Sequence, residues 1–172
     1  MNRLLRLLDQ QRGSATIEFA LVSLFFFGIV MVGLDFGIYA QQNLKLSNAV
    51  EQASIVAFDA RSAQPVVDKT KLVNYIGATV GGAPTVTIQC NGTATCDNSA
   101  PASKCIGAPS ATTGWPTFTD PSGSGGNLTC ASGATPGYYV VIRAARTYKS
   151  VVVPDKYLNN GNMQQQAVVR LS

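Results

Sequence analysis

Four cysteines are the residues of this sequence best suited to covalent chemistry: Cys90, Cys96, Cys105 and Cys130. They lie in a region rich in Gly, Ser, Thr, Asn and Pro, and none has the short Cys-x-x-Cys spacing that zinc sites use. An even number of cysteines in such a region favours two disulfides formed in an oxidising compartment, with free structural thiols as the alternative. Four cysteines allow three pairings, and the sequence does not choose among them.

Histidine is absent from the chain. Its absence removes the usual general base, the commonest nitrogen ligand of zinc, and any Ser–His or Cys–His nucleophilic pair. The 9 acidic residues form no recognisable catalytic motif. We therefore expect no catalytic residue, no metal and no cofactor, and an enzyme is the weakest of the functional classes.

The net charge of +4 comes from 13 Lys and Arg against 9 Asp and Glu. Arg3, Arg6 and Arg12 against Asp9 give residues 1–13 a charge of +2, which leaves +2 for the rest of the chain. The later cations are spread out and form no dense stripe of the kind that binds a phosphate backbone. The sequence therefore predicts no nucleic-acid partner.

Glu18 is an acidic residue a few positions inside an apolar run that extends to Leu34. Insertion scales assign an acidic group at mid-bilayer a cost of about 2.5–3.5 kcal/mol, and less near an end, so such a group usually has a partner. No Lys or Arg follows Glu18 within the run. Proteolysis between Gly13 and Ser14 would create an α-amino group as that partner. The alternative is a tolerated interfacial carboxylate that reaches toward lipid headgroups.

A membrane span is the element that would position Glu18. Ala15 to Leu34 would be about 30 Å long as a helix, enough to cross the hydrocarbon of a bilayer. Three arginines precede the span, and an acidic and polar flank follows it. Since positive residues stay in the cytoplasm, the rest of the chain is expected outside the inner membrane. Asp35 marks the outer edge of the span and is given no further role.

The helical pattern continues beyond the span, and we predict one helix from about Ala15 to Ala60 that ends before Pro65. Its second half is amphipathic. The residues expected to face inward are Leu46, Ala49, Val50, Ala53, Val56, Ala57 and Ala60. The residues expected on the opposite face are Gln41, Lys45, Asn48, Gln52 and Asp59.

A small α+β head follows. A second helix is predicted from the N-cap Asp68 to Val80, with Leu72, Val73, Ile76 and Val80 inward and Gly81-Gly82 as the stop. The predicted strands and turn are Thr85–Cys90, Tyr138–Tyr148 (with Val151–Val153 extending or following it), Asn159–Gly161 as the turn, and Gln166–Leu171. Asn91–Gly137 is of low complexity and is expected to be held by cross-links, with Trp115 as a loop anchor. Strands after helices favour a small antiparallel sheet with disulfide-stapled loops.

The N-terminal motif carries a family resemblance. Gly13 followed by Ser14-Ala15-Thr16-Ile17-Glu18, after a basic leader and before a long apolar helix, resembles the prepilin-peptidase site of type IV pilins. The wider run RGSATIEFALVSLFFFGIVMVGLDFGIYAQQNLKLSNAVEQA is similar to TadE-like pseudopilins of tight-adherence (Tad/Flp) pilus systems. The later run YYVVIRAARTYKSVVVP agrees with their β-rich periplasmic head. Phe19 stands where the major Flp pilins typically have Tyr, and those pilins are much shorter.

The resemblance implies a division of the chain and a role for three residues. Residues 1–13 would be a cleaved leader, residues 14–61 the long helix, and residues 62–172 the periplasmic head. Gly13 would be recognised at the scissile bond before Ser14. Glu18 would pair with the new amine of a neighbouring subunit and set the register of the filament.

By the same resemblance the chain is a minor pilin or pseudopilin that supports assembly of an adhesive pilus. Its partners would be other pilins and pseudopilins, the prepilin peptidase, the pilus assembly machinery and the inner membrane. It would cross that membrane once, with a cytoplasmic N-terminus and a periplasmic head, and its entry into the extracellular pilus is left open.

Two other functions remain from the sequence. The chain could be a membrane-anchored periplasmic binding or adhesive module with no fibre role. It could also be a secreted domain whose signal peptide is cut near Ala40, although the apolar core is long for a signal sequence. The N-terminus of the mature chain separates the three readings, since it would be Ser14, Met1 or a residue near Gln41 respectively.

Overall fold

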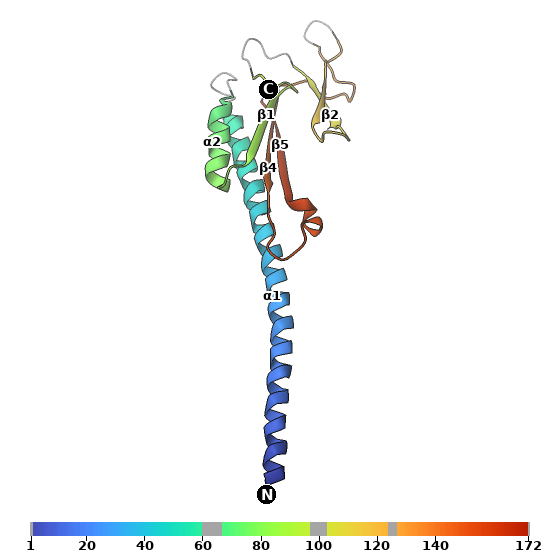
Figure 1. The fold of residues 1–172 in the computed structure, drawn as a ribbon. Helices are drawn as coiled ribbons and strands as arrows, with labels where there is room; N and C mark the ends of the chain where they lie inside the picture. The colour runs from blue at the N-terminus through green and yellow to red at the C-terminus, as the bar shows by residue number, and fades with distance from the viewer. Residues whose placement is uncertain (1, 60–66, 97–102, 124–126, 172) are drawn as a thin grey trace. The chain divides into compact units, whose positions relative to one another are not determined.

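The computed structural model describes residues 2–59, 67–96, 103–123 and 127–171, and for residues 2–13 only the backbone. The predicted α+β class is confirmed (Figure 1). The helices and strands follow in the order α1 (Asn2–Asp59), α2 (Lys69–Val80), β1 (Thr85–Cys90), β2 (Cys105–Pro109), β3 (Pro116–Thr119), β4 (Tyr139–Thr147), the 3₁₀ turns η2 (Asp155–Tyr157) and η3 (Asn159–Gly161), and β5 (Asn162–Arg170).

The chain forms two compact units. The first contains Met1–Gln41 and Lys149–Gly161, and the second contains Gln42–Tyr148 and Asn162–Ser172. We describe each unit by itself, and call the second one the sheet unit.

Helix α1 begins at Asn2, although the sequence pattern predicts its start at about Ala15. The difference has a simple cause, because residues 2–12 consist largely of Leu, Arg and Gln, which are strong helix formers, and contain no Gly or Pro. The helix ends at Asp59. The predicted end at Ala60 lies outside the described residues.

The second half of α1 buries one narrow stripe in the sheet unit. The buried residues of this stripe are Leu46, Ala49, Val50, Ala53 and Ala57, none more than 2% exposed. All five predicted polar positions of the opposite face are exposed, which confirms the amphipathic pattern. The prediction for Val56 is wrong, because its side chain lies at the rim of the stripe and is 37% exposed.

Helix α2 begins where its capping signal predicts. The carboxylate of Asp68 accepts a hydrogen bond from the backbone N–H of Lys71 at 3.1 Å, which satisfies one of the free amides of the first turn. Three residues spaced four apart, Leu72, Ile76 and Val80, are buried. Val73 was expected inward and is 37% exposed, because it lies beside that row rather than on it. Gly81 ends the helix with a φ of +67°.

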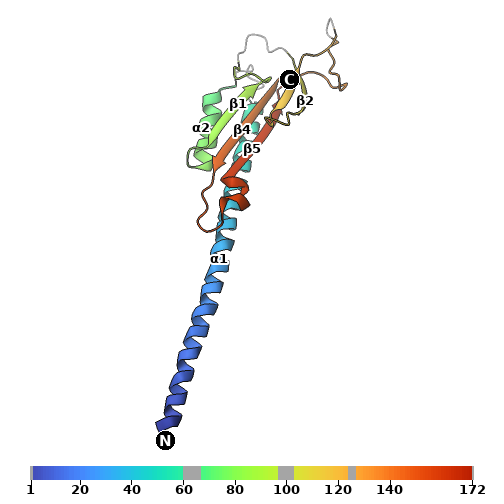
Figure 2. The same cartoon turned by 45° about the vertical axis from the view of Figure 1, so that its right-hand side comes forward.

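The three-stranded sheet has the order β1-β4-β5, and both neighbouring pairs are antiparallel. In the central register Ile142 of β4 lies opposite Ile88 of β1 and Ala167 of β5. Within the sheet unit, the C-terminal part of α1 lies behind the sheet with α2 beside it (Figures 1 and 2). Hydrogen bonds join these layers, from the Tyr75 hydroxyl to Gln52 at 2.7 Å and from the Gln165 amide to Asn43 at 3.0 Å.

Strand β4 is buried on both faces in its first half. Val140, Val141 and Ile142 are all fully buried. A β-hairpin of β2 and β3, which the sequence did not predict, contacts β4 on its second face through ring and cation–π contacts. Its Phe118 ring lies 6.1 Å from the ring of Tyr139, centroid to centroid. The hairpin explains why a central strand shows a nearly continuous apolar run.

The end of the chain follows the predicted turn and strand with a shifted boundary. Asn159, Asn160 and Gly161 all have positive φ values, of +54°, +53° and +71°, as their turn signal predicts. Strand β5 begins at Asn162 rather than Gln166, because backbone pairing with β4 extends through polar residues that show no alternation. Val151–Val153 do not extend β4 but form a bend.

Candidate functional site

The predicted cleavage and assembly residues lie together on the N-terminal part of α1. Gly13 and Ser14 are both helical, and Glu18 follows Ser14 by four residues, so the two side chains lie on one face of the helix. Ser14 and Glu18 are exposed. Within the described residues no hydrogen bond or ion pair reaches the Glu18 carboxylate. A single copy of the chain therefore offers Glu18 no described partner.

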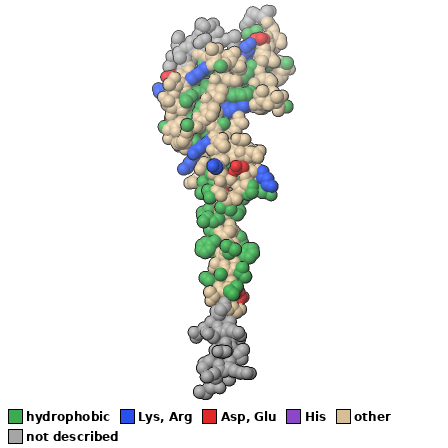
Figure 3. All heavy atoms as spheres, in the orientation of Figure 1, with side chains coloured by type: hydrophobic (Ala, Val, Ile, Leu, Met, Phe, Trp, Pro, Cys, Tyr) green, Lys and Arg blue, Asp and Glu red, His purple; other side chains and the backbone are tan. Residues whose placement is uncertain are grey.

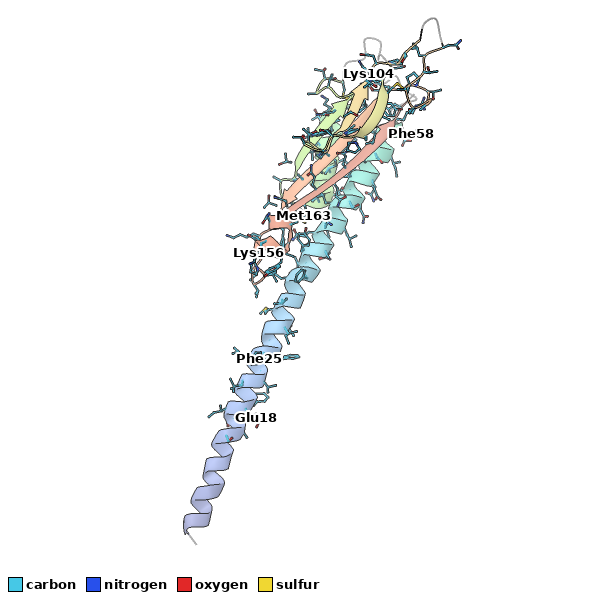
Figure 4. All side chains as sticks on the ribbon, turned by 90° about the vertical axis from the view of Figure 1, so that its right-hand side faces the viewer. Glu18, Phe25, Phe58, Lys104, Lys156 and Met163 are labelled. Atoms are coloured by element: carbon cyan, nitrogen blue, oxygen red, sulfur yellow. A yellow bond between two sulfur atoms is a disulfide. The ribbon has the colours of Figure 1, made fainter. Side chains whose placement is uncertain are left out.

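An apolar surface surrounds Glu18 and continues along the helix. Figure 3 shows hydrophobic side chains along this stretch of α1, and Figure 4 shows Glu18 and Phe25 on it. Its large apolar side chains are exposed by 39–74%: Ile17, Phe19, Leu21, Val22, Leu24, Phe25, Phe26, Phe27, Ile29, Val30, Met31, Val32 and Leu34. This stretch is long and apolar enough to cross a membrane, and none of its most apolar window is buried within the chain. The helix is therefore a membrane-anchor candidate, and its surface is available to lipid or to other helices.

Asp35 ends the apolar run and has a role that the sequence did not reveal. Its side chain is only 3% exposed. Oδ2 accepts backbone N–H groups from Val151 at 3.0 Å, Val152 at 2.8 Å and Val153 at 2.9 Å, and Oδ1 accepts from Val151 at 3.2 Å. The expectation that Asp35 needs no further role is wrong.

Three consecutive backbone N–H groups around one carboxylate form an anion-binding nest, in which every bond is assisted by the negative charge. The contact joins residues that lie 116 to 118 positions apart in the chain. Because the donors are backbone amides, no side-chain type at Val151–Val153 signals them. A carboxylate directly after an apolar run was the only sign in the sequence.

The four cysteines form two disulfides, as predicted. Cys90 is bonded to Cys96 and Cys105 to Cys130, with Cα–Cα distances of 5.2 and 5.6 Å. The structure thus chooses one of the three possible pairings. The first bridge closes a loop after β1, and the second ties β2 to a turn that precedes β4.

Arg143 of β4 anchors the loop between β2 and β3. Its guanidinium carbon lies 3.9 Å from the centroid of the Trp115 ring, a cation–π contact. Nε and Nη2 donate to the Gln166 side-chain oxygen at 3.1 and 2.6 Å, and Nη1 donates to the Thr113 carbonyl at 3.0 Å. Desolvation by burial lowers the pKa of Arg143 from its ordinary value, but a guanidinium stays charged in a protein. The cluster therefore stabilises the hairpin on the sheet.

Comparison with known families finds a match within α1. Residues 13–54 match the family model of TadE-like proteins. This segment is TadE-like. The match begins at Gly13, contains Ser14 and Glu18, and covers about a quarter of the chain. It confirms the resemblance drawn from Arg12 to Ala53 in the sequence. No curated protein and no solved structure matches the chain.

Proposed function

We propose that the chain is a minor pilin or pseudopilin, a membrane-anchored structural subunit that supports assembly of a Tad/Flp-type adhesive pilus. The observation that carries the proposal is Glu18, an exposed carboxylate on an exposed apolar helix inside the TadE-like segment. A carboxylate without a partner is unfavourable in lipid, so the favourable state is one in which another subunit provides a positive charge.

The positive charge comes from processing in this proposal. Cleavage between Gly13 and Ser14 creates an α-amino group at the start of the mature helix. That amine on one subunit pairs with Glu18 of its neighbour and sets how far adjacent helices are displaced along the fibre. Residues 1–13 are then a leader, residues 14–61 are the anchoring helix, and residues 62–172 are the periplasmic head.

The proposal also assigns partners and location. The prepilin peptidase removes the leader, and other pilins and pseudopilins together with the assembly machinery pack against the helix. The chain crosses the inner membrane once, with the basic leader in the cytoplasm, in agreement with the distribution of positive residues. The disulfides agree with an oxidising compartment for the head.

Sequencing the N-terminus of the mature chain, together with its intact mass, tests the processing step. The chain should begin at Ser14. Gly13→Asp should leave the precursor uncut, because a side chain at the scissile bond obstructs the approach of the peptidase to the backbone. Gln11→Asp, which adds the same charge two residues earlier, should be processed normally. A mature chain that begins at Met1 or near Gln41, or normal cleavage of the Gly13→Asp chain, would exclude a prepilin.

A further inference from the structure

The segment between β4 and β5, Lys149–Gly161, exposes apolar side chains in an unusual concentration. Val151 is 84% exposed, Val152 is 48% exposed and Tyr157 is 65% exposed. Val153 and Leu158 of the same segment are buried, at 6% and 2% exposure, so one side of the segment is packed against the protein. We call Lys149–Gly161 the 149–161 loop. Three large apolar groups directed outward from a packed loop indicate a surface that contacts something apolar.

The nest around Asp35 fixes where this loop lies along α1. Asp35 follows Leu34, the last residue of the apolar run, and it holds the N–H groups of Val151 and Val152 within 3.2 Å of its carboxylate. The apolar surface of α1 continues past this level, since Phe36 and Ile38 are 43% and 44% exposed. Loop and helix therefore present apolar groups at one level, where the candidate membrane span ends.

The charges of the loop suit a lipid surface. Lys149 and Lys156 are exposed, and the Lys156 ammonium lies 4.9 Å from the centroid of the Tyr157 ring. The Asp155 carboxylate accepts a hydrogen bond from the Ser150 hydroxyl. Two lysines and one aspartate give the loop a net charge of +1. Figure 4 shows Lys156 on the loop, beyond Phe25 along α1. A cationic, aromatic and aliphatic mixture is the composition of membrane-interface anchors.

We propose that the 149–161 loop is a second membrane contact, docked on the phospholipid surface at the outer end of the α1 span. Val151 and Val152 insert at the boundary of headgroups and acyl chains, Tyr157 lies at headgroup level, and Lys149 and Lys156 bind lipid phosphates. The inference rests on the membrane anchorage proposed above. Asp35 makes this contact possible, because it satisfies three backbone N–H groups that would otherwise lose their water at the membrane.

Depth-dependent fluorescence quenching of the full chain in vesicles of phosphatidylethanolamine and phosphatidylglycerol tests the proposal. Trp115→Phe removes the single natural tryptophan, and Tyr157→Trp then places one reporter on the loop. Its emission should be blue-shifted and should fall by roughly half with a doxyl quencher near the lipid carbonyls, the depth of interfacial tryptophans. A quencher deep in the acyl chains should act far less. In a second chain with Phe25→Trp as the reporter, the deep quencher should be the stronger one.

Substitution of Val151 and Val152 by Asp in the Tyr157→Trp chain should abolish quenching by lipid and expose the reporter to aqueous iodide. Both valines are exposed, so the substitution leaves the packed side of the loop intact. Flotation of every chain with the vesicles reports the anchorage of α1 separately. A chain that floats, and whose loop reporter is quenched by iodide and by neither lipid quencher, would overturn the docked loop and leave the anchor in place. A chain that does not float would contradict the anchor itself.

A low ratio of protein to lipid keeps neighbouring copies apart in this experiment. If the blue shift appears only when the ratio is raised, a second copy of the chain rather than lipid covers the loop, and the proposal is wrong.

Discussion

Residues 14–34 and residues 42–59 of α1 are both rich in apolar side chains, but the two stretches differ in what covers those side chains. Phe19, Leu24 and Phe25 in the first stretch are 71–74% exposed. Leu46, Ala49 and Ala53 in the second are fully buried by the sheet unit. The second stretch has an apolar stripe and an opposite polar face, whereas the first is apolar on all sides.

The difference indicates that the two stretches of α1 are suited to different surroundings. In the second stretch, the apolar stripe packs against the folded sheet unit of the same chain, and the opposite polar face is exposed to water. A helix that is apolar on all sides must be covered by lipid or by other helices. In the described structure, no other part of the chain buries the most apolar window of this stretch. Substitutions in the second stretch should therefore change the stability of the sheet unit, while substitutions in the first should change anchorage and assembly.

The largest contrast is expected from one substitution made in both stretches. Leu46→Ala should destabilise the sheet unit by about 2–5 kcal/mol, because it removes a fully buried side chain and leaves a cavity. Leu24→Ala, at a position 71% exposed, should change it by less than about 0.5 kcal/mol. Urea unfolding in detergent, followed by the fluorescence of Trp115, measures both variants. Equal changes in the free energy of unfolding would contradict the difference in burial between the two stretches of α1.

The disulfides should matter only to the sheet unit, which contains all four cysteines. Replacing Cys105 and Cys130 by Ser should destabilise it by roughly 2–4 kcal/mol, since their bridge closes the longer loop. Replacing Cys90 and Cys96 should have a smaller effect, because their bridge spans only 6 residues. Alkylation without reductant followed by peptide mass analysis checks the pairing. Labelled thiols in the natural chain, or peptides cross-linked between Cys96 and Cys105, would contradict it.

Asp35 directly follows the first stretch. Its substitution should have a smaller effect on stability than the loss of a buried leucine or of the longer disulfide loop. Asp35→Asn removes the charge and part of the acceptor capacity, which should loosen the 149–161 loop by about 1–3 kcal/mol. Hydrogen exchange should then rise at the amides of Val151–Val153 and not in β4. Asp120→Asn is the control, because it removes only an exposed ion pair with Lys104, worth less than about 1 kcal/mol. Unchanged exchange at the three amides would show that the nest does not hold the loop.

Local signals in the sequence predicted much of the fold. The bounds of β1 agree with the prediction, Asp68 caps α2, and the turn at Asn159–Gly161 has the expected positive φ values. Each of these features depends on residues within a few positions of one another. Val56 and Val73 were misplaced because helical spacing gives the centre of a buried stripe better than its edges.

The hairpin of β2 and β3 and the Asp35 nest could not be predicted, since tertiary contacts define both. Strand β2 contains Gly107 and Pro109, which argue against a strand, and it is held by a disulfide and by pairing with β3. The nest depends on backbone amides more than a hundred residues away. The candidate site could be predicted, because Gly13, Ser14 and Glu18 form a local motif in the sequence, and the TadE-like match contains it.

The most direct test of the account is Glu18→Gln, which keeps the shape and hydrogen bonding of the side chain and deletes its charge. Membrane level and cleavage after Gly13 should be unchanged or slightly improved, because a neutral amide is cheaper to insert in lipid. The number of fibres counted by electron microscopy should fall strongly. Glu51→Gln removes an exposed carboxylate from the second stretch of α1 and should leave fibre number unchanged. Normal fibre number with Gln at position 18 would contradict the pairing of Glu18 with a neighbouring subunit.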